Sequence, residues 1–273
     1  MEYILGASGL VLLIAWAALL AGAVFWRSAS TLDRPGWLAA RCRTGAPTGL
    51  ALTAAVLTLA TSAWSLALVT FSVVHHTGLA RYDPRVLAFV TGHRAPWLTG
   101  LAKVLTWLGS SLVLWPVAII AGLGLWRWRR HWLPAVLPAL ALAGAWAGAL
   151  LIKGLVDRPR PPAADRLTLV HGWSYPSQHA AQALATWGML ALMLMAGRSA
   201  RARVLLAAGA VLIAFVVGLT RLYLGAHWMT DVLGGWALAG VWDCLLIICY
   251  LLAPQVAAPP EPQAPAAVYR KAA

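Results

Sequence analysis

The fold is decided by the stretch LPAVLPALALAGAWAGALLIKGLVDRPRP, residues 133–161. The part from Leu133 to Ile152 carries no charged side chain. Its length matches the roughly 20 apolar residues that a helix needs to cross the hydrocarbon core of a bilayer. Lys153 and two arginines follow directly. The stretch therefore predicts a membrane-spanning helix with a cluster of cations at its exit.

Composition places the whole chain in the same class. Hydrophobic residues make up 61% of the 273 residues and charged residues only 11%, which excludes a soluble globular domain. Apolar runs of membrane-spanning length occur at 3–25, 48–74, 101–126, 132–152, 179–197, 204–220 and 228–252. The sequence therefore predicts an all-α polytopic transmembrane bundle of seven helices.

We expect three parts along the chain. Residues 1–47 would form an extra N-terminal transmembrane helix and a cytoplasmic loop, because the first run lacks a basic leader and is too long for a signal peptide. Residues 48–252 would form a six-helix core. Residues 253–273 are rich in proline and would form a disordered cytoplasmic tail.

Arginine and lysine in the short loops indicate the orientation, since positive charge is retained on the cytoplasmic side. The basic clusters are Arg27, Arg34, Arg41 and Arg43 after the first run, Arg127, Arg129 and Arg130 after the third, Arg198, Arg201 and Arg203 after the fifth, and Arg270 and Lys271 in the tail. This alternation predicts that residues 75–100, 153–178 and 221–227 lie on the extracytoplasmic side. The net charge of +13 then reflects topology and contact with anionic headgroups, so we expect no nucleic-acid partner.

Lys153 and Arg160 are the first candidate binding residues. An ammonium group is a compact charge and a guanidinium is a planar fork, and together they can hold several oxygens of a phosphate. Such cations in an outer loop break the charge rule, which a phosphate site would explain. A basic loop that binds lipid headgroups is the alternative.

The second candidate group is Ser177, Gln178 and His179, at the start of the fifth of the seven apolar runs. Ser177 is placed as a helix N-cap, so its hydroxyl and the free amides that follow would lie at the positive end of a helix, where anions bind. His179 could then protonate a leaving oxygen as a general acid. Taken alone, this pattern usually marks only a helix cap.

The third group joins Arg221 to His227 and Asp231. The last two are four residues apart and therefore share one face of a helix. A carboxylate behind an imidazole fixes its tautomer and stabilises its cation, which would make His227 a directed nucleophile. A structural polar pair at a turn is the alternative.

Joined, the three groups resemble the type 2 phosphatidate phosphatase superfamily of integral membrane proteins, which includes lipid phosphatases and vanadium haloperoxidases. The family pattern is Lys, six residues and Arg-Pro; then Pro-Ser-Gly-His; then Ser-Arg, five residues, His, three residues and Asp. This chain reads Lys153 to Arg160-Pro161, Pro176-Ser177-Gln178-His179, and Thr220-Arg221 to His227 to Asp231. Gln178 replaces the glycine and Thr220 the serine, and neither change removes a catalytic group.

The resemblance implies hydrolysis of a phospholipid or polyprenyl phosphate at the extracytoplasmic face of the cell membrane. It implies that Lys153, Arg160 and Arg221 clamp the phosphoryl oxygens, helped by Ser177 and the Gln178 amide. His227, oriented by Asp231, would form a phosphohistidine while His179 protonates the leaving oxygen. No metal and no other cofactor is expected.

Three other functions stay open at this point. They are a lipid phosphotransferase on the same scaffold, a vanadate-dependent peroxidase, against which the membrane setting argues, and a non-enzymatic lipid transporter or scaffold. The sequence also leaves open the oligomeric state and the lipid, with undecaprenyl diphosphate, phosphatidate and phosphatidylglycerol phosphate as candidates. Polar residues of the outer loop are expected to be solvated, with the lining of a substrate entrance as the alternative: His75, His76, Arg81, Asp83, His93 and Arg94.

Overall fold

The computed structural model describes residues 49–253. This part contains eight α-helices, three 3-10 helices and no strand, which confirms the all-α prediction. The α-helices are α3 (Leu50–Val74), α4 (Asp83–Gly92), α5 (Pro96–Leu105), α6 (Ser111–Arg129), α7 (Leu133–Val156), α8 (Gln178–Met195), α9 (Ala200–Tyr223) and α10 (Met229–Leu252). The predicted N-terminal span and the proline-rich tail lie outside the described residues, and the division into three parts stays a prediction.

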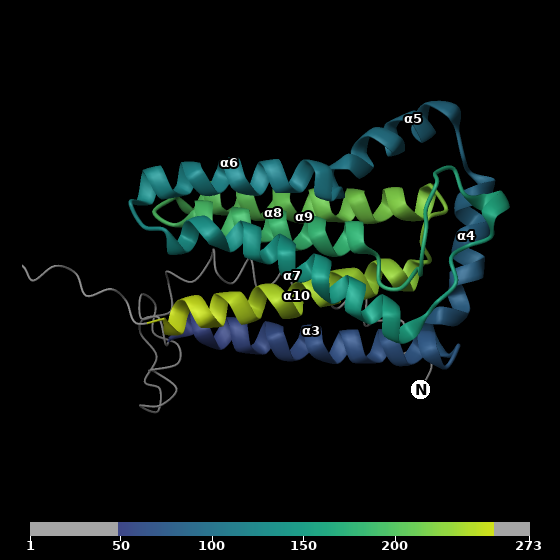
Figure 1. Ribbon diagram of the computed structural model, residues 1–273, viewed down its shortest axis with the longest axis horizontal. Coiled ribbons are helices and arrows are strands. Elements are labelled where there is room, and N and C mark those ends of the chain that lie inside the picture. Colours follow the sequence, from purple (N-terminus) through teal and green to yellow (C-terminus); the bar gives the residue numbers. More distant parts are fainter. Residues whose placement is uncertain (1–48, 254–273) are drawn as a thin grey trace, which may run out of the picture.

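Six long helices, α3 and α6 to α10, run alongside one another (Figure 1). Within residues 49–253, five of them are long and apolar enough to cross a membrane, and α8 is the exception. Its 18 residues give a length of about 27 Å, and its first turns carry Gln178, His179 and Gln182. The polar start of α8 therefore lowers its mean hydropathy at the end where the candidate residues lie.

Helix α8 occupies the centre of the bundle and packs against α6, α7, α9 and α10. Ala180, Ala181, Ala183 and Ala185 are fully buried on it. Small side chains let helix backbones approach closely inside a membrane. At Gly235 of α10, a Cβ atom would lie 2.5 Å from the carbonyl oxygen of Ser177. This close approach brings the beginnings of α8 and α10 together.

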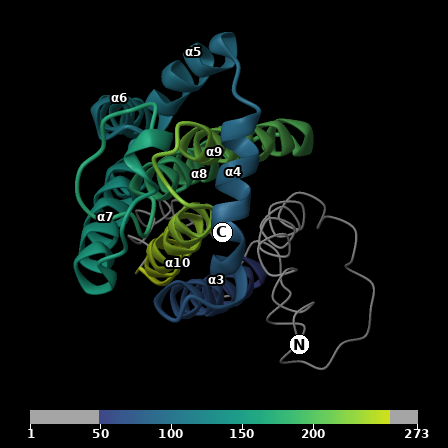
Figure 2. The ribbon, with the colours of Figure 1, turned by 90° about the vertical axis from the view of Figure 1, so that its right-hand side faces the viewer.

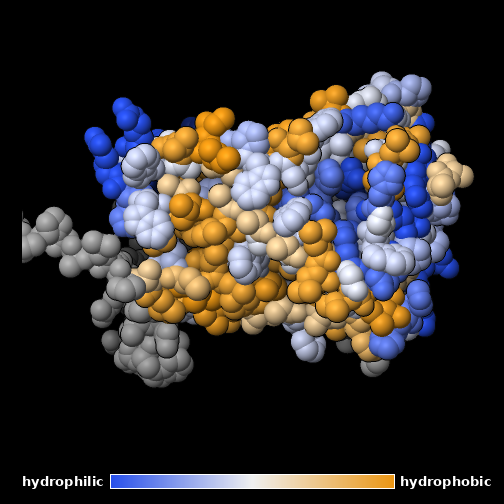
Figure 3. Space-filling view, viewed as in Figure 1, coloured by the Kyte–Doolittle hydropathy of each residue, from blue (hydrophilic) through white to orange (hydrophobic). Residues whose placement is uncertain are grey.

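The surface has the pattern of a membrane protein. Hydrophobic residues cover the middle of the face seen in Figure 3, and hydrophilic residues gather towards its two ends. Large apolar side chains are exposed along the spans, among them Leu57, Ile120 and Leu212. A bilayer around the middle of the bundle would cover them.

The two ends of the bundle differ in content. One end carries α4, α5, the segment 157–177 and the turn from α9 to α10, as Figure 2 shows from that side. The turns from α6 to α7 and from α8 to α9, which contain Arg130 and Arg198, lie at the opposite end (Figure 1). The candidate residues predicted to share one side of the membrane therefore share one end of the bundle.

The sequence interpretation of residues 75–110 was wrong in two respects. The region expected to be an outer loop contains α4 and α5, and the span expected from residue 101 begins only at Ser111. The apolar run is interrupted at Gly109, where a Cβ would lie 2.8 Å from the carbonyl oxygen of His179. Ser110 then caps α6 by accepting a hydrogen bond from the amide of Leu112 at 3.3 Å. Helix α4 lies across the end of the bundle and contacts α9 and α10 (Figure 2).

Candidate active site

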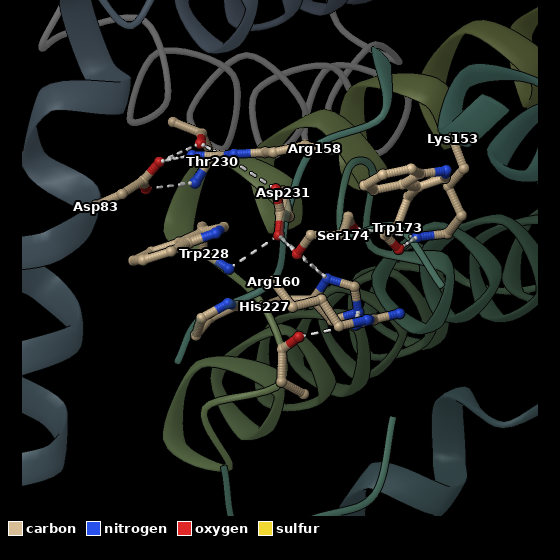
Figure 4. Close-up of polar contacts among 12 residues, drawn as sticks. Asp83, Lys153, Arg158, Arg160, Trp173, Ser174, His227, Trp228, Thr230 and Asp231 are labelled. Carbon is tan, nitrogen blue, oxygen red and sulfur yellow. Dashed lines mark hydrogen bonds and ion pairs between the residues drawn. The ribbon is translucent and has the colours of Figure 1, made fainter. Parts of the chain in front are cut away.

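His227 and Asp231 form a buried pair at the beginning of α10 (Figure 4). Nδ1 of His227 lies 3.2 Å from Oδ2 of Asp231. The exposed fraction is 3% for the histidine and zero for the aspartate. The spacing of four residues therefore places the two side chains in contact, as predicted.

Asp231 accepts more hydrogen bonds than the one from His227. Its Oδ2 also accepts from the amide of Trp228 at 2.9 Å and from the hydroxyl of Ser174. Its Oδ1 accepts from Nη1 of Arg158 at 2.6 Å. Four donors hold this carboxylate ionised and fix its orientation. Because Asp231 only accepts, Nδ1 of His227 carries the ring hydrogen and Nε2 keeps a lone pair.

His227 is uncharged in this environment. Burial lowers its pKa to about 3, although the hydrogen bond to Asp231 acts in the opposite direction. The cations of Arg221 and Arg160 add to the lowering. The imidazole is therefore neutral near pH 7, which is the form that can act as a nucleophile.

Arg160 lies beside the free nitrogen of His227. Its Nη1 is 3.2 Å from Nε2 of His227 and donates to the carbonyl oxygen of Ala226 at 2.8 Å. Its other nitrogens donate to the carbonyl oxygens of His171 at 3.0 Å and Gly172 at 2.9 Å. Arg160 thus braces the segment 157–177 and places a cation at the candidate nucleophile.

Lys153 also contacts this segment. Its Nζ donates to the carbonyl oxygens of Trp173 at 2.8 Å and Ser174 at 3.1 Å. Ser174 in turn donates to Asp231. Ser174 therefore links Lys153 to the His227–Asp231 pair (Figure 4).

The beginning of α8 supplies neutral donors. Ser177 stands at the N-cap, as predicted, but its hydroxyl makes no capping bond. The hydroxyl is fully buried and has no hydrogen-bond partner within residues 49–253. The backbone of Ser177 is engaged instead, since its amide donates to the carbonyl oxygen of Asp231 at 2.8 Å. The amides of Gln178 and His179 belong to the first turn, which has no intrahelical acceptors.

Arg221 lies in the last turn of α9 and is almost fully buried, at 4% exposed. Its Nη1 donates to the hydroxyl of Thr106 at 2.9 Å, while its Nε has no acceptor in the described part of the chain. A buried donor without an acceptor costs about 1–3 kcal/mol. A bound phosphate would offer an acceptor to the Nε of Arg221, and its oxygens could also accept from the unpartnered hydroxyl of Ser177.

Sequence reasoning missed the ion pairs that lie behind His227 and Asp231. Arg158 donates from Nη2 to Oδ2 of Asp83 at 2.5 Å, in addition to its bond with Asp231. Asp83 also accepts from the amide and the hydroxyl of Thr230 at 3.0 and 2.5 Å. Burial raises the pKa of Asp83 above its ordinary value, and the guanidinium of Arg158 opposes that rise.

The expectation of solvated outer-loop residues was therefore wrong for Asp83 and Arg94. Asp83 is 2% exposed. Arg94 donates to the carbonyl oxygens of Asp165 at 2.7 Å and Tyr223 at 2.9 Å. A signal for the first existed in the sequence, because Asp83-Pro84 is a typical helix start. No local pattern could have identified the partners, which are distant in the chain.

Tyr175 fixes the end of the segment that carries these contacts. It is fully buried, and its hydroxyl lies 2.8 Å from that of Thr70 on α3. Gly234 of α10 gives it room, since a Cβ there would be 2.5 Å from the ring. The segment is thus anchored to two spans next to the His227–Asp231 pair.

Comparison with known proteins agrees with this geometry. The family model described as PAP2 superfamily matches residues 135–254. Phosphatidylglycerophosphatase B of Bacillus subtilis (strain 168) is 30% identical over 177 residues, which cover 63% of this chain and 84% of that protein.

Two solved structures are also similar. The first is the crystal structure of the transmembrane PAP2 type phosphatidylglycerolphosphate phosphatase from Bacillus subtilis, with a TM-score of 0.62, 29% identity, and coverage of 67% of this chain and 92% of that one. The second is Aquifex aeolicus LpxE, with a TM-score of 0.49, 26% identity, and coverage of 62% of this chain and 95% of that one. Together with the buried His227–Asp231 pair and the cations around it, the matched sequence and fold show that the chain belongs to the PAP2 superfamily and is a multi-pass membrane phosphatase.

Proposed function

We propose that the protein hydrolyses the terminal phosphate of a membrane lipid through a phosphohistidine at His227, with phosphatidylglycerol phosphate as the first candidate substrate. One observation carries the proposal: Asp231 holds Nδ1 of His227 at 3.2 Å while Arg160 lies 3.2 Å from Nε2. An oriented nucleophilic nitrogen next to a fixed guanidinium is the arrangement that phosphoryl transfer requires. The names of the Bacillus subtilis relatives support the choice of lipid.

In the first step, Nε2 of His227 bonds to phosphorus as the bond from phosphorus to the lipid oxygen breaks. His179, which must take up a proton when the anionic phosphate binds beside it, gives that proton to the departing oxygen, which leaves as the lipid alcohol. Asp231 stabilises the positive charge that develops on the imidazole of His227. Arg160 must turn its Nη1 from Nε2 towards a phosphoryl oxygen for the attack to occur.

In the second step, water attacks phosphorus and the bond to Nε2 breaks, which releases inorganic phosphate. His179 takes the proton that water loses and so returns to its starting state. Both steps pass through a trigonal-bipyramidal phosphoryl group whose oxygens carry growing negative charge.

Five groups would hold the phosphoryl oxygens during these steps. Lys153, Arg160 and Arg221 supply charge, and the Ser177 hydroxyl and the Gln178 amide supply neutral hydrogen bonds. The unpartnered Nε of Arg221 and the unpartnered hydroxyl of Ser177 support this assignment. Donors held in place before the reaction stabilise the transition state without reorganisation. Three cations here would do what a magnesium ion does in other phosphotransfer enzymes.

We infer that the site faces the extracytoplasmic side of the cell membrane, because arginines dominate the turns at the opposite end of the bundle. A reporter fused after Val170 should then read as outside, and one fused after Arg201 should read as inside. The reverse result would place the site in the cytoplasm.

A phosphate-release assay on the purified protein in detergent tests the activity. We expect release of phosphate from phosphatidylglycerol phosphate. The rates for phosphatidate and undecaprenyl diphosphate are measured for comparison, and the His227→Gln variant is assayed with each lipid. Release that persists in this variant would contradict the role of His227. A parent protein that releases no phosphate from any of the three lipids would contradict the proposed function and favour a transporter or scaffold.

A further inference from the structure

Asp83, Arg158 and Asp231 form a continuous chain of buried charges that ends at His227 (Figure 4). Arg158 is the link, with 2.5 Å from its Nη2 to Asp83 and 2.6 Å from its Nη1 to Asp231. Its side chain is only 10% exposed. Each nitrogen of the guanidinium fork is therefore assigned to a different carboxylate.

The net charge of Asp83, Arg158 and Asp231 decides how well a positive charge on His227 is stabilised. If Arg158 were paired with Asp231 alone, the two charges would cancel, and the carboxylate would lose much of its ability to stabilise an imidazolium. Asp83 adds a second negative charge behind the guanidinium. The three groups together then carry one net negative charge, which is what the positive ring of a phosphohistidine intermediate needs nearby.

Position and charge are linked through Thr230. The amide of Thr230 donates to Oδ1 of Asp83 at 3.0 Å, and its hydroxyl donates to Oδ2 at 2.5 Å. The same hydroxyl accepts from Nη1 of Arg158 at 2.7 Å. Asp83 thus caps the first turn of α10, the turn that carries Asp231, and ties α4 to it.

We propose that Asp83 is a positioning residue for the phosphatase reaction, which acts through Arg158 to keep Asp231 oriented and able to stabilise positive charge on His227. The inference rests on the proposed role of His227 as nucleophile. Asp83 itself touches neither His227 nor the phosphoryl donors among the described contacts. Its loss should therefore slow the chemical step and leave substrate binding unchanged.

The first test is Asp83→Asn, which keeps the shape and removes the charge. We expect kcat to fall at least about tenfold, by analogy with the partners that orient metal-ligating histidines from behind, while KM stays within about twofold. Asp157→Asn is the matched control, because Asp157 precedes Arg158, is exposed, and makes no ion pair within residues 49–253. Asparagine also tolerates its left-handed backbone (φ 48°). The control should keep the parental kcat.

The second test is the double variant Asp83→Asn with Arg158→Gln. Removal of both charges leaves Asp231 with its own negative charge, so kcat should be higher than in Asp83→Asn by about threefold or more. Coupling of this kind between two substitutions is expected for residues in one network. Arg158→Gln alone would leave two buried carboxylates without their common cation and should lower the melting temperature more than the double variant does.

The results separate the possible roles. A lower melting temperature in Asp83→Asn with parental kcat would overturn the proposal and leave Asp83 a purely structural tether. Losses of kcat that multiply in the double variant, with no recovery, would overturn it as well. If His227→Gln lost phosphate release while Asp83→Asn kept the parental rate, the proposed function would stand and only the inference about Asp83 would be rejected.

Discussion

Nη1 of Arg160 lies 3.2 Å from Nε2 of His227, the nitrogen that would attack phosphorus. Because the neutral ring offers its lone pair there, the arginine holds the nucleophile in a fixed direction and also blocks it. A phosphoryl oxygen is a stronger acceptor for a guanidinium than an imidazole nitrogen. Substrate would therefore draw Arg160 away and free Nε2 in one movement.

Replacement of His227 tests this arrangement most directly. We expect His227→Gln to lower kcat at least about a thousandfold, because the covalent intermediate cannot form. His171→Gln is a suitable control, since His171 is exposed and only its carbonyl oxygen contacts Arg160. Initial rates of phosphate release on both variants measure the effect. Near-parental turnover of His227→Gln would rule out histidine nucleophilic catalysis at this position.

The hydroxyls of Ser177 and Ser174 should respond differently to removal. Ser177→Ala deletes a buried hydroxyl that has no partner, so the melting temperature should hold or rise while kcat/KM falls about tenfold. Ser174→Ala deletes a donor to Asp231, so it should lower both the melting temperature and kcat. Thermal unfolding in detergent and rate measurements check the pair. A large loss of stability in Ser177→Ala would contradict a role for its hydroxyl in binding phosphate.

Gly225, in the turn that delivers His227, should not tolerate a side chain. Its φ is +65°, and a Cβ would lie 2.1 Å from the carbonyl oxygen of Asp165. Gly172 has a similar φ of +67° but open space around it. Gly172→Ala should lower the free energy of unfolding by only about 1–2 kcal/mol, the strain of an alanine in a left-handed backbone. Gly225→Ala should lower it clearly more and should also reduce activity. Equal melting temperatures for the two variants would show that the turn can move away from Asp165.

The stability of the protein should depend on pH through His227. Its pKa is about 3 in the folded state against the ordinary 6.5, so the unfolded chain takes up a proton that the folded one does not. The free energy of unfolding should therefore fall as pH drops from about 6.5 towards 3, by up to about 1.4 kcal/mol per pH unit. The melting temperature of His227→Gln should fall less between about pH 7 and pH 5 than that of the parent or of His171→Gln. An identical decrease in all three would mean that His227 is not buried in its neutral form.

Inhibition by vanadate would report on the same nitrogen. Vanadate can become five-coordinate by bonding to a histidine and so resembles the phosphoryl transition state, and it should bind at least about 100-fold more tightly than phosphate. EDTA should change the rate little, because Lys153, Arg160 and Arg221 would supply the positive charge. Loss of activity in EDTA with recovery in Mg²⁺ would contradict this assignment, and so would indifference to vanadate.

The sequence was sufficient where the physical signal is local. Apolar length predicted five of the spans that the structure describes, and the spacing of His227 and Asp231 predicted their contact. It failed where partners are distant in the chain. Asp83 looks like a solvated loop acid until Arg158 and Thr230, far along the chain, are seen around it. Ser174 has no pattern at all, since only the fold brings its hydroxyl to Asp231.

The span expected from residue 101 shows that hydropathy does not locate the end of a helix. Hydropathy runs continuously through Gly109, because averaging over a window cannot detect a place where two backbones touch. Only the packing of Gly109 against the carbonyl of His179 explains why α6 begins later. The start of α6 is thus determined by its packing against α8 as well as by its own sequence.

Lys153 and Arg160 both donate to backbone carbonyls between His171 and Ser174. The two cations that we propose to bind substrate therefore also hold in place the segment that presents Ser174 to Asp231. A variant that lacks either cation would lose these hydrogen bonds to the segment as well as a phosphate-binding group, so its inactivity could not be attributed to one of the two. For trapping a lipid on an intact but inert protein, the imidazole is the better group to remove, since its departure leaves every one of those carbonyl contacts in place.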